Sequence, residues 1–160
     1  MGKQSAGLLL YRCGGEGTEV LLVHPGGPFY VRKDEGVWSV PKGELEPGEE
    51  PVAVALREFE EELGSAAPVD PGALVELGSV RQKGGKVVVA WCAPGDFDVT
   101  RAQSSTFALE WPPRSGQIRE FPEVDRAGWF SLAEARRKLV PAQAELVDRL
   151  EALLRPASSL

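Results

Sequence analysis

Hydrophobic positions along the chain follow two patterns, one of continuous or alternating runs and one that repeats every three to four residues. Runs of the first kind predict strands, and the two nearest the start are continuous enough to be covered on both faces of a sheet. The Lys83-Gly84-Gly85 segment between two later runs predicts a hairpin turn. The predicted strands span residues 5–12, 19–24, 37–40, 74–82, 86–93 and 106–111. We expect a loop followed by a short strand over residues 119–130.

The clearest helical pattern lies between Pro51 and Gly64. Proline is tolerated in the first turn of a helix, and glycine commonly follows the last turn. At 100° per residue, one arc of this helix carries apolar side chains, which predicts the face that packs on the core. These side chains belong to Val52, Ala55, Leu56, Phe59 and Leu63.

Two further helices are expected near the end of the chain. Ser131 and Glu134 have the spacing of a capping box, which predicts a helix from there to about Val140. Another helix is expected from Pro141 to Leu154, with a stripe of leucines typical of core packing. Strands around a central helix, with helices closing the chain, indicate an α/β fold.

Composition narrows the class of protein. The 160 residues are enough for one domain with its own core, which we expect over residues 1–155, with a frayed tail at 156–160. No apolar run approaches the roughly 18 residues of a membrane helix, and no segment resembles a signal peptide. A net charge of −6 argues against a surface for long nucleic acids. Only Cys13 and Cys92 are present, which favours a reduced, cytoplasmic chain.

A second arc of the central helix carries Glu58, Glu61 and Glu62, roughly 120° from the apolar arc. Like charges three or four residues apart repel by about 0.2–0.5 kcal/mol per pair, and Arg57 projects to the side of this arc. Three carboxylates at one place favour a hard divalent cation, which takes oxygen ligands. From the helix alone, a solvated acidic face is the competing interpretation.

The spacing of residues around this helix resembles the Nudix box. The fixed positions are Gly43, Glu49, Arg57-Glu58, Glu61-Glu62 and Gly64, separated by five, seven, two and one residues. Ser65 departs from the pattern, because the family usually carries an aliphatic residue there. The resemblance implies an α/β/α sandwich with a mixed β-sheet, and hydrolysis of a diphosphate linkage in a nucleoside diphosphate derivative.

The resemblance also implies which carboxylates bind metal. Glu58, Glu61 and Glu62 would be ligands of Mg²⁺ or Mn²⁺, and Glu61 or Glu58 would be the general base. The sequence leaves the choice between these two open, since carboxylates around one metal titrate as a group.

Five further residues have expected roles around these carboxylates. Arg57 would orient them by ion pairing, and Gly43 would let the backbone come close to a metal or phosphate for lack of a Cβ. Glu49 is expected to anchor the loop. The family often recruits one more carboxylate from outside the box, for which Glu123 is the first choice and Glu120 the competitor.

Substrate contacts are expected from basic and aromatic residues outside the helix. The basic candidates are Lys42, Lys83 and Lys86, each against the alternative of a solvated lysine. Tyr30, Phe29 or Trp38 could stack on a nucleobase, although Trp38 fits the core better. His24, the only histidine, is expected to have a structural role at the end of its strand.

Beyond the box, the chain resembles the small Nudix enzymes that cut dinucleoside polyphosphates asymmetrically. The segments that carry this resemblance are A-G-L-L-L-Y-R, W-S-V-P-K-G-E-L-E-P-G-E, V-V-V-A-W and W-F-S-L-A-E-A. The leading expectation is therefore a pyrophosphohydrolase acting on diadenosine tetraphosphate. The alternatives are an NTP pyrophosphohydrolase, an RNA 5′ pyrophosphohydrolase and a Nudix module that senses a nucleotide without turnover. Oligomeric state stays open.

Overall fold

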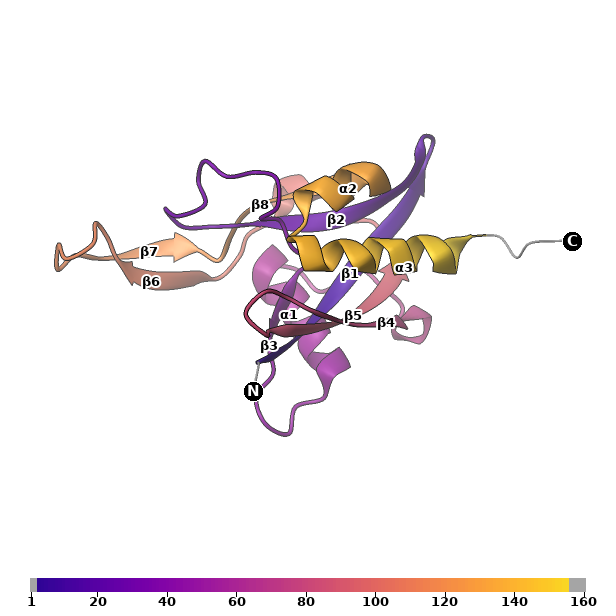
Figure 1. Cartoon of the computed structure of the whole chain (residues 1–160), viewed down its shortest axis with the longest axis horizontal. Coiled ribbons are helices and arrows are strands. Elements are labelled where there is room, and N and C mark those ends of the chain that lie inside the picture. Colours follow the sequence, from indigo (N-terminus) through magenta and orange to yellow (C-terminus); the bar gives the residue numbers. More distant parts are fainter. Residues whose placement is uncertain (1–2, 156–160) are drawn as a thin grey trace, which may run out of the picture.

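The computed structural model describes residues 3–155, so the tail expected at 156–160 lies outside the described residues. Its main sheet has six strands in the order β4-β5-β1-β2-β8, with β3 paired to β1 (Figure 1). The strands are β1 (Gln4–Gly14), β2 (Gly17–Pro25), β3 (Lys42–Glu44), β4 (Val75–Arg81), β5 (Val87–Pro94) and β8 (Val124–Ser131). β1 and β5 run parallel and the other pairs run antiparallel, so the sheet is mixed.

Helices cover both faces of this sheet (Figure 1). They are α1 (Pro51–Leu63), α2 (Leu132–Lys138) and α3 (Ala144–Leu154). Successive side chains of a strand point to opposite faces. Leu8 and Leu10 of β1 accordingly pack in the cluster that contains Phe59 of α1, whereas Leu9 packs with Leu146 of α3. The fold is an α/β/α sandwich with a mixed sheet, which confirms the expected fold class.

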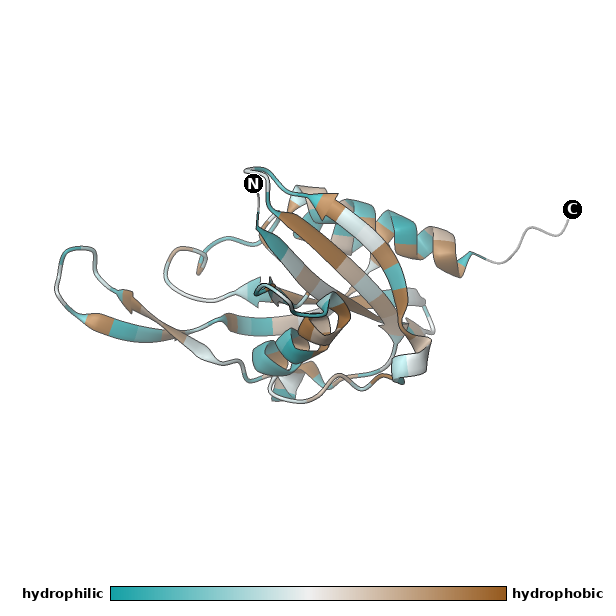
Figure 2. Cartoon of the chain, turned by 90° about the horizontal axis from the view of Figure 1, so that it is seen from below, coloured by the Kyte–Doolittle hydropathy of each residue, from teal (hydrophilic) through white to brown (hydrophobic). Residues whose placement is uncertain are grey.

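Helix α1 begins and ends as its sequence predicts. Pro51 is its first residue, and Gly64 follows it in the left-handed region at φ 83°, with its N–H donating to the Glu60 carbonyl at 2.7 Å. Ala55, Phe59 and Leu63 of the predicted apolar arc are buried, and so is Val54, which the arc did not include. Figure 2 shows one hydrophobic and one hydrophilic side of this helix.

Two expectations for strands are wrong. Residues 37–40 form no strand, because Trp38 and Ser39 make single bridges to different partners, Leu139 and Val23. The first half of 119–130 is a strand and not a loop. Strands β6 (Thr106–Glu110) and β7 (Ile118–Pro122) form a hairpin that projects from the body of the molecule (Figures 1 and 2).

Two strands, β2 and β3, pair with different parts of one edge of β1, and this arrangement positions the candidate site. Residues Ser5, Ala6 and Gly7 pair with β3, whereas the far end of β1, from Tyr11 to Gly14, pairs with β2. β3 is thereby held against the sheet beside α1, and β2 continues toward β8. The short strand β3 contains Gly43, the first residue of the Nudix pattern.

No helix within residues 3–155 combines the length and apolar character needed to cross a membrane. Cys13 is exposed and Cys92 is buried, and both are free thiols.

Candidate active site

The three glutamates of the second arc of α1 line one hollow of about 320 Å³. Its remaining walls come from β3, from the segment before β6 and from the junction of β7 and β8. The lining residues are Lys42, Gly43, Glu44, Glu58, Glu61, Glu62, Ser105 and Glu123. We call this space the carboxylate hollow. It brings together the predicted metal ligands, Lys42, and the carboxylate expected from outside the box.

Gly43 lies directly under a carboxylate of α1. The pairing of Ala6 with Gly43 fixes the backbone of β3 at this point. A Cβ built on Gly43 would overlap the carboxyl group of Glu58. Only glycine therefore leaves room for the Glu58 side chain in its observed position.

The carboxylates of the hollow are partly removed from water. Burial raises the pKa of Glu62 to about 8, against the opposing effect of Lys42, whose backbone N–H donates to Glu62 Oε2 at 3.1 Å. Burial and then the charge of Glu61 raise the pKa of Glu58. Burial lowers the pKa of Lys42. Negative charge is thus costly in this hollow, and a bound cation would offset that cost.

Arg57 connects the box loop to the carboxylates. Its guanidinium forms a close ion pair with Glu49, and this hydrogen bond lowers the pKa of Glu49. Glu49 Oε1 also accepts from the backbone N–H of Glu46 at 2.8 Å. Arg57 Nε lies 3.6 Å from Glu58 Oε2 and 4.0 Å from Glu61 Oε1. The arginine therefore lies between the loop and two of the glutamates that line the hollow.

Glu123 and Glu120 occupy different parts of the molecule. The N–H of Glu123 donates to the Ser105 carbonyl at 2.9 Å, and the N–H of Ser105 donates to the Glu61 carbonyl at 2.9 Å. This short relay holds Glu123 beside α1. Glu120 instead lies in β7 opposite Ala108, on the exposed face of the hairpin. Ser105 was not predicted, because its link to α1 depends on the position of the β6–β7 hairpin, which no local pattern reveals.

The remaining candidates lie around the hollow at different depths. Lys86 Nζ is 3.8 Å from Glu44 Oε1, so Lys86 reaches the edge of the carboxylate hollow. Lys83 is exposed in the β4–β5 turn and does not line this hollow. Tyr30 lines a neighbouring hollow that shares Lys42.

His24 and Trp38 belong to the interior. The His24 ring is fully buried, with Nδ1 at 2.8 Å from Asp125 and Nε2 at 2.7 Å from the Lys33 carbonyl. Trp38 is 4% exposed, and its indole N–H donates to Asp34 at 2.8 Å. The contact with the Lys33 carbonyl ties the 26–36 connection to β2, and the contact with Asp34 ties it to Trp38.

The donor set of the carboxylate hollow fits a hard divalent cation. Its ligating groups are carboxylate oxygens, and the missing Cβ of Gly43 leaves the room that the Glu58 carboxyl group occupies. Within residues 3–155, no three His, Cys, Asp or Glu side chains already close around one ion position.

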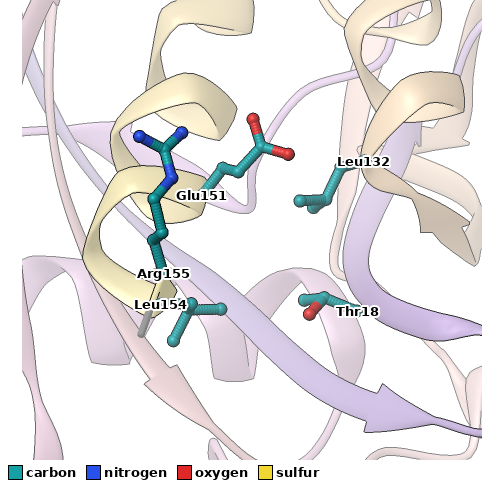
Figure 3. Close-up of a pocket in the computed structure, with 5 residues that line it drawn as sticks. All are labelled: Thr18, Leu132, Glu151, Leu154 and Arg155. Carbon is teal, nitrogen blue, oxygen red and sulfur yellow. The ribbon is translucent and has the colours of Figure 1, made fainter. Parts of the chain in front are cut away.

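A hollow larger than the carboxylate hollow lies elsewhere on the molecule. It measures about 440 Å³ and lies between the end of α3 and the starts of β2 and α2 (Figure 3). Thr18, Leu132, Glu151, Leu154 and Arg155 line it, and none of them lines the carboxylate hollow.

The NUDIX domain model matches residues 1–150 of the chain. The chain belongs to the NUDIX family. This confirms the resemblance found in the spacing from Gly43 to Gly64. Nudix hydrolases generally use divalent metals, in agreement with the oxygen donors of the carboxylate hollow.

Two curated relatives carry the same name, bis(5′-nucleosyl)-tetraphosphatase [asymmetrical]. The rat protein is 42% identical over 94 residues, which cover 54% of this chain and 64% of the relative. The pig protein is 40% identical over 83 residues, which cover 46% of this chain and 54% of the relative. The chain thus spans less than two thirds of the length of either relative.

Solved structures of differently named proteins show the same fold. The Caenorhabditis elegans Ap4A hydrolase binary complex aligns with a TM-score of 0.63 at 24% identity, over 95% of this chain and 97% of the other. The NUDIX domain of Shewanella oneidensis NrtR, complexed with ADP ribose, aligns with a TM-score of 0.65 at 18% identity, over 97% and 90%. The fold alone therefore does not select a substrate.

Proposed function

We propose that this chain is a metal-dependent pyrophosphohydrolase that acts on dinucleoside polyphosphates, with diadenosine tetraphosphate as the leading substrate. The observation that carries the proposal is the meeting of Glu58, Glu61, Glu62 and Glu123 in one hollow. The two tetraphosphatase relatives support the substrate class. Domain 1–155 would carry this activity as a single unit, and its two free thiols fit a reducing cytoplasm.

The four glutamates would hold Mg²⁺ or Mn²⁺. When bound, such an ion neutralises phosphate charge and lowers the pKa of a coordinated water. Gly43 keeps the space that the Glu58 carboxyl group needs. Arg57 holds Glu58 and Glu61 in place from the side of the box loop.

The proton of the attacking water would pass to Glu61 or Glu58. Glu61 is the more exposed of the two, with 51% of its side chain accessible against 16% for Glu58. A base that meets water inside the hollow has to be reachable from it, and this favours Glu61.

The substrate would be held by residues on the rim of the carboxylate hollow. Lys42 lies on its wall and Lys86 at its edge, where each faces the phosphate chain with a positive charge. Lys83 would act at longer range from the β4–β5 turn. Tyr30 would receive a nucleobase.

A substrate panel tests the proposal. Purified protein with Mg²⁺ or Mn²⁺ is given dinucleoside polyphosphates, NTPs, ADP-ribose and RNA with a 5′ triphosphate, and products are separated by chromatography. We expect fastest turnover with a dinucleoside tetraphosphate, and loss of at least about 100-fold in kcat in Glu61→Gln.

Other outcomes of the panel would replace this proposal. Turnover that survives in the Glu58→Gln, Glu61→Gln double variant would contradict the assignment of these residues. Faster cleavage of NTPs or RNA would shift the substrate class. Tight nucleotide binding without turnover would indicate a sensing module.

A further inference from the structure

The carboxylate hollow continues into a groove. A second hollow of about 200 Å³ shares Lys42, Glu62 and Glu123 with it. A third hollow of about 280 Å³ shares Ser39 and Lys42 with the second, and it extends to Tyr30 and Gln82. We call this third hollow the base end of the groove. A ligand that starts at the glutamates can therefore extend along Lys42 to Tyr30 without leaving a concave surface.

A buried amide behind the base end has a fixed orientation. Gln143 is fully buried, and its Oε1 lies 3.0 Å from the backbone nitrogen of Val40. A backbone N–H can only donate, so the atom that faces it is the oxygen of Gln143. The nitrogen of Gln143 consequently donates to Ser39 Oγ at 3.0 Å and to Gln82 Oε1 at 2.8 Å.

This network also orients Gln82. Because Gln143 donates to Gln82, the oxygen of the Gln82 amide faces the interior, and its NH₂ group remains for other partners. No side chain or carbonyl of the described part of the chain accepts a hydrogen bond from that NH₂ group. Gln82 lines the base end, so its two N–H donors are offered to whatever occupies this hollow.

The base end also contains an aromatic ring. Tyr30 is partly exposed there, and Lys33 lies over its ring at 5.6 Å from the centroid. An aromatic side chain can stack on any nucleobase, whereas an amide of fixed orientation distinguishes bases by the hydrogen-bonding atoms at their edges. The volume of the base end is close to the lower limit of about 300 Å³ for small-molecule pockets.

We propose that the base end binds a purine base of the nucleotide substrate, with Tyr30 stacking on the ring and Gln82 donating to a ring nitrogen. The proposal rests on the function proposed above, because it places the phosphates at Lys42 and the glutamates. Gln82 is then a specificity-determining residue, and Gln143 is the positioning residue that sets its donor character.

Steady-state kinetics with diadenosine tetraphosphate test the two contacts. Gln82→Leu removes the donors, and we expect KM to rise about 3- to 10-fold with kcat unchanged within twofold. Tyr30→Leu should raise KM about fivefold or more, whereas Tyr30→Phe, which keeps the ring, should not. Gln117→Leu is the matched control for Gln82→Leu, since Gln117 does not line the groove. Thermal melts identify any variant that fails to fold.

Analogues of ADP in which ring atom N1, N3 or N7 is replaced by carbon test the hydrogen bond itself. Calorimetry should show about 3- to 10-fold weaker binding of at least one analogue to the wild-type protein. That penalty should disappear in Gln82→Leu and in Gln82→Glu, which keeps the shape of Gln82 but loses its donors. A penalty that persists in both variants, or the absence of any penalty in the wild-type protein, would overturn the proposal.

The outcomes separate this proposal from the proposed function. Turnover of diadenosine tetraphosphate with KM unaffected by Gln82→Leu and Tyr30→Leu would leave the function standing and remove the base end as its subsite. Absence of turnover with every substrate, together with ADP binding that depends on Gln82, would remove the function and keep the base end. Neither turnover nor ADP binding would overturn both.

Discussion

The carboxylate hollow and the base end are two parts of one groove that the chain builds in different ways. In the carboxylate hollow, the residues from Gly43 to Glu62 lie close together in sequence on β3 and α1, and their contacts involve charges. In the base end, Tyr30, Gln82 and Gln143 come from three distant segments, and a neutral hydrogen bond joins the two glutamines. The first arrangement is suited to holding a cation and phosphates. The second is suited to recognising an uncharged ring.

This difference leads to a kinetic distinction. Interactions made only in the transition state change kcat, whereas interactions made equally in the ground state change KM. Substitutions in the carboxylate hollow should therefore lower kcat, and those in the base end should raise KM. The predictions below test the distinction in order of decreasing expected effect on turnover.

Gly43→Ala should have the largest effect. The added Cβ would overlap the Glu58 carboxyl group and displace it from the hollow. Misplacement of a reacting group by about 1 Å can lower the rate about 100-fold, so we expect a fall in kcat on the order of 100-fold with a smaller change in KM. Gly15→Ala is the control, because no atom lies within 4 Å of a Cβ built there. Equal rates for the two variants would show that Gly43 has no steric role.

Glu123→Gln should weaken metal binding about 10- to 100-fold, a change that a titration of activity against Mn²⁺ concentration measures. The reason is that Glu123 lies in the carboxylate hollow, held beside α1 through Ser105. Glu120→Gln makes the same change of charge three residues earlier, on the exposed face of the hairpin, and should leave the titration unchanged. The reverse result would make Glu120 the outer ligand and would require the hairpin to move.

Arg57→Ala should lower kcat by about tenfold, the smaller end of the effects seen for residues that orient metal ligands. Without the guanidinium, Glu58 and Glu61 lose their contact with Glu49 and the box loop. Arg57→Lys keeps the charge but not the planar fork, so its rate should recover only in part. A rise in KM with unchanged kcat would instead assign Arg57 to substrate binding.

The sequence predicts the parts of this site whose residues lie close together in the chain, and it does not predict the contacts between distant segments. The helix from Pro51 to Gly64 and its three glutamates are specified by periodicity and spacing within about twenty residues. The position of Glu123 could be predicted only from the family pattern, and its relay through Ser105 could not be predicted at all. Gln82 and Gln143 were missed for the same reason, because 61 residues separate them and the packing of the turn Pro141–Gln143, just before α3, against the end of β4 brings them together.

The fold shows the same division. Apolar patterns predicted β1, β2, β4 and β5 to within a few residues, and the signal was strongest for β1, β2 and β5, which contain runs of buried residues. Strand β7 (I-R-E-F-P) has two adjacent charged residues and a terminal proline, and it forms because it pairs with β6. Tertiary pairing, which no window of residues contains, overrode the local preference there.

A buried thiol in the sheet that supports both parts of the groove should make the free energy of unfolding depend on pH. Cys92 lies in β5 beside Leu9 of β1, is 1% exposed, and has its pKa raised to about 11 by burial. An unfolded thiol titrates near about 8.5, so between these values the unfolded chain loses a proton that the folded chain keeps. Below about pH 8.5 the Cys92 thiol is protonated in both states and has no pH-dependent effect on stability. As pH rises toward 11, ionisation of this thiol in the unfolded chain lowers the free energy of unfolding by up to about 1.4 kcal/mol per pH unit.

Cys92→Ala should be less stable than the wild-type protein at pH 7, because it leaves a small cavity, and the gap should narrow between pH 8.5 and 11. Urea unfolding across this range measures the gap, and Cys13→Ala, at an exposed position, should follow the wild-type curve. A gap that stays constant with pH would mean that the Cys92 thiol does not titrate differently in the two states.

The same measurement helps to interpret turnover at high pH. If the stability gap narrows, a loss of turnover over the same pH range is a loss of folded protein. Only a decline that occurs while the protein remains folded then reports on the carboxylate hollow.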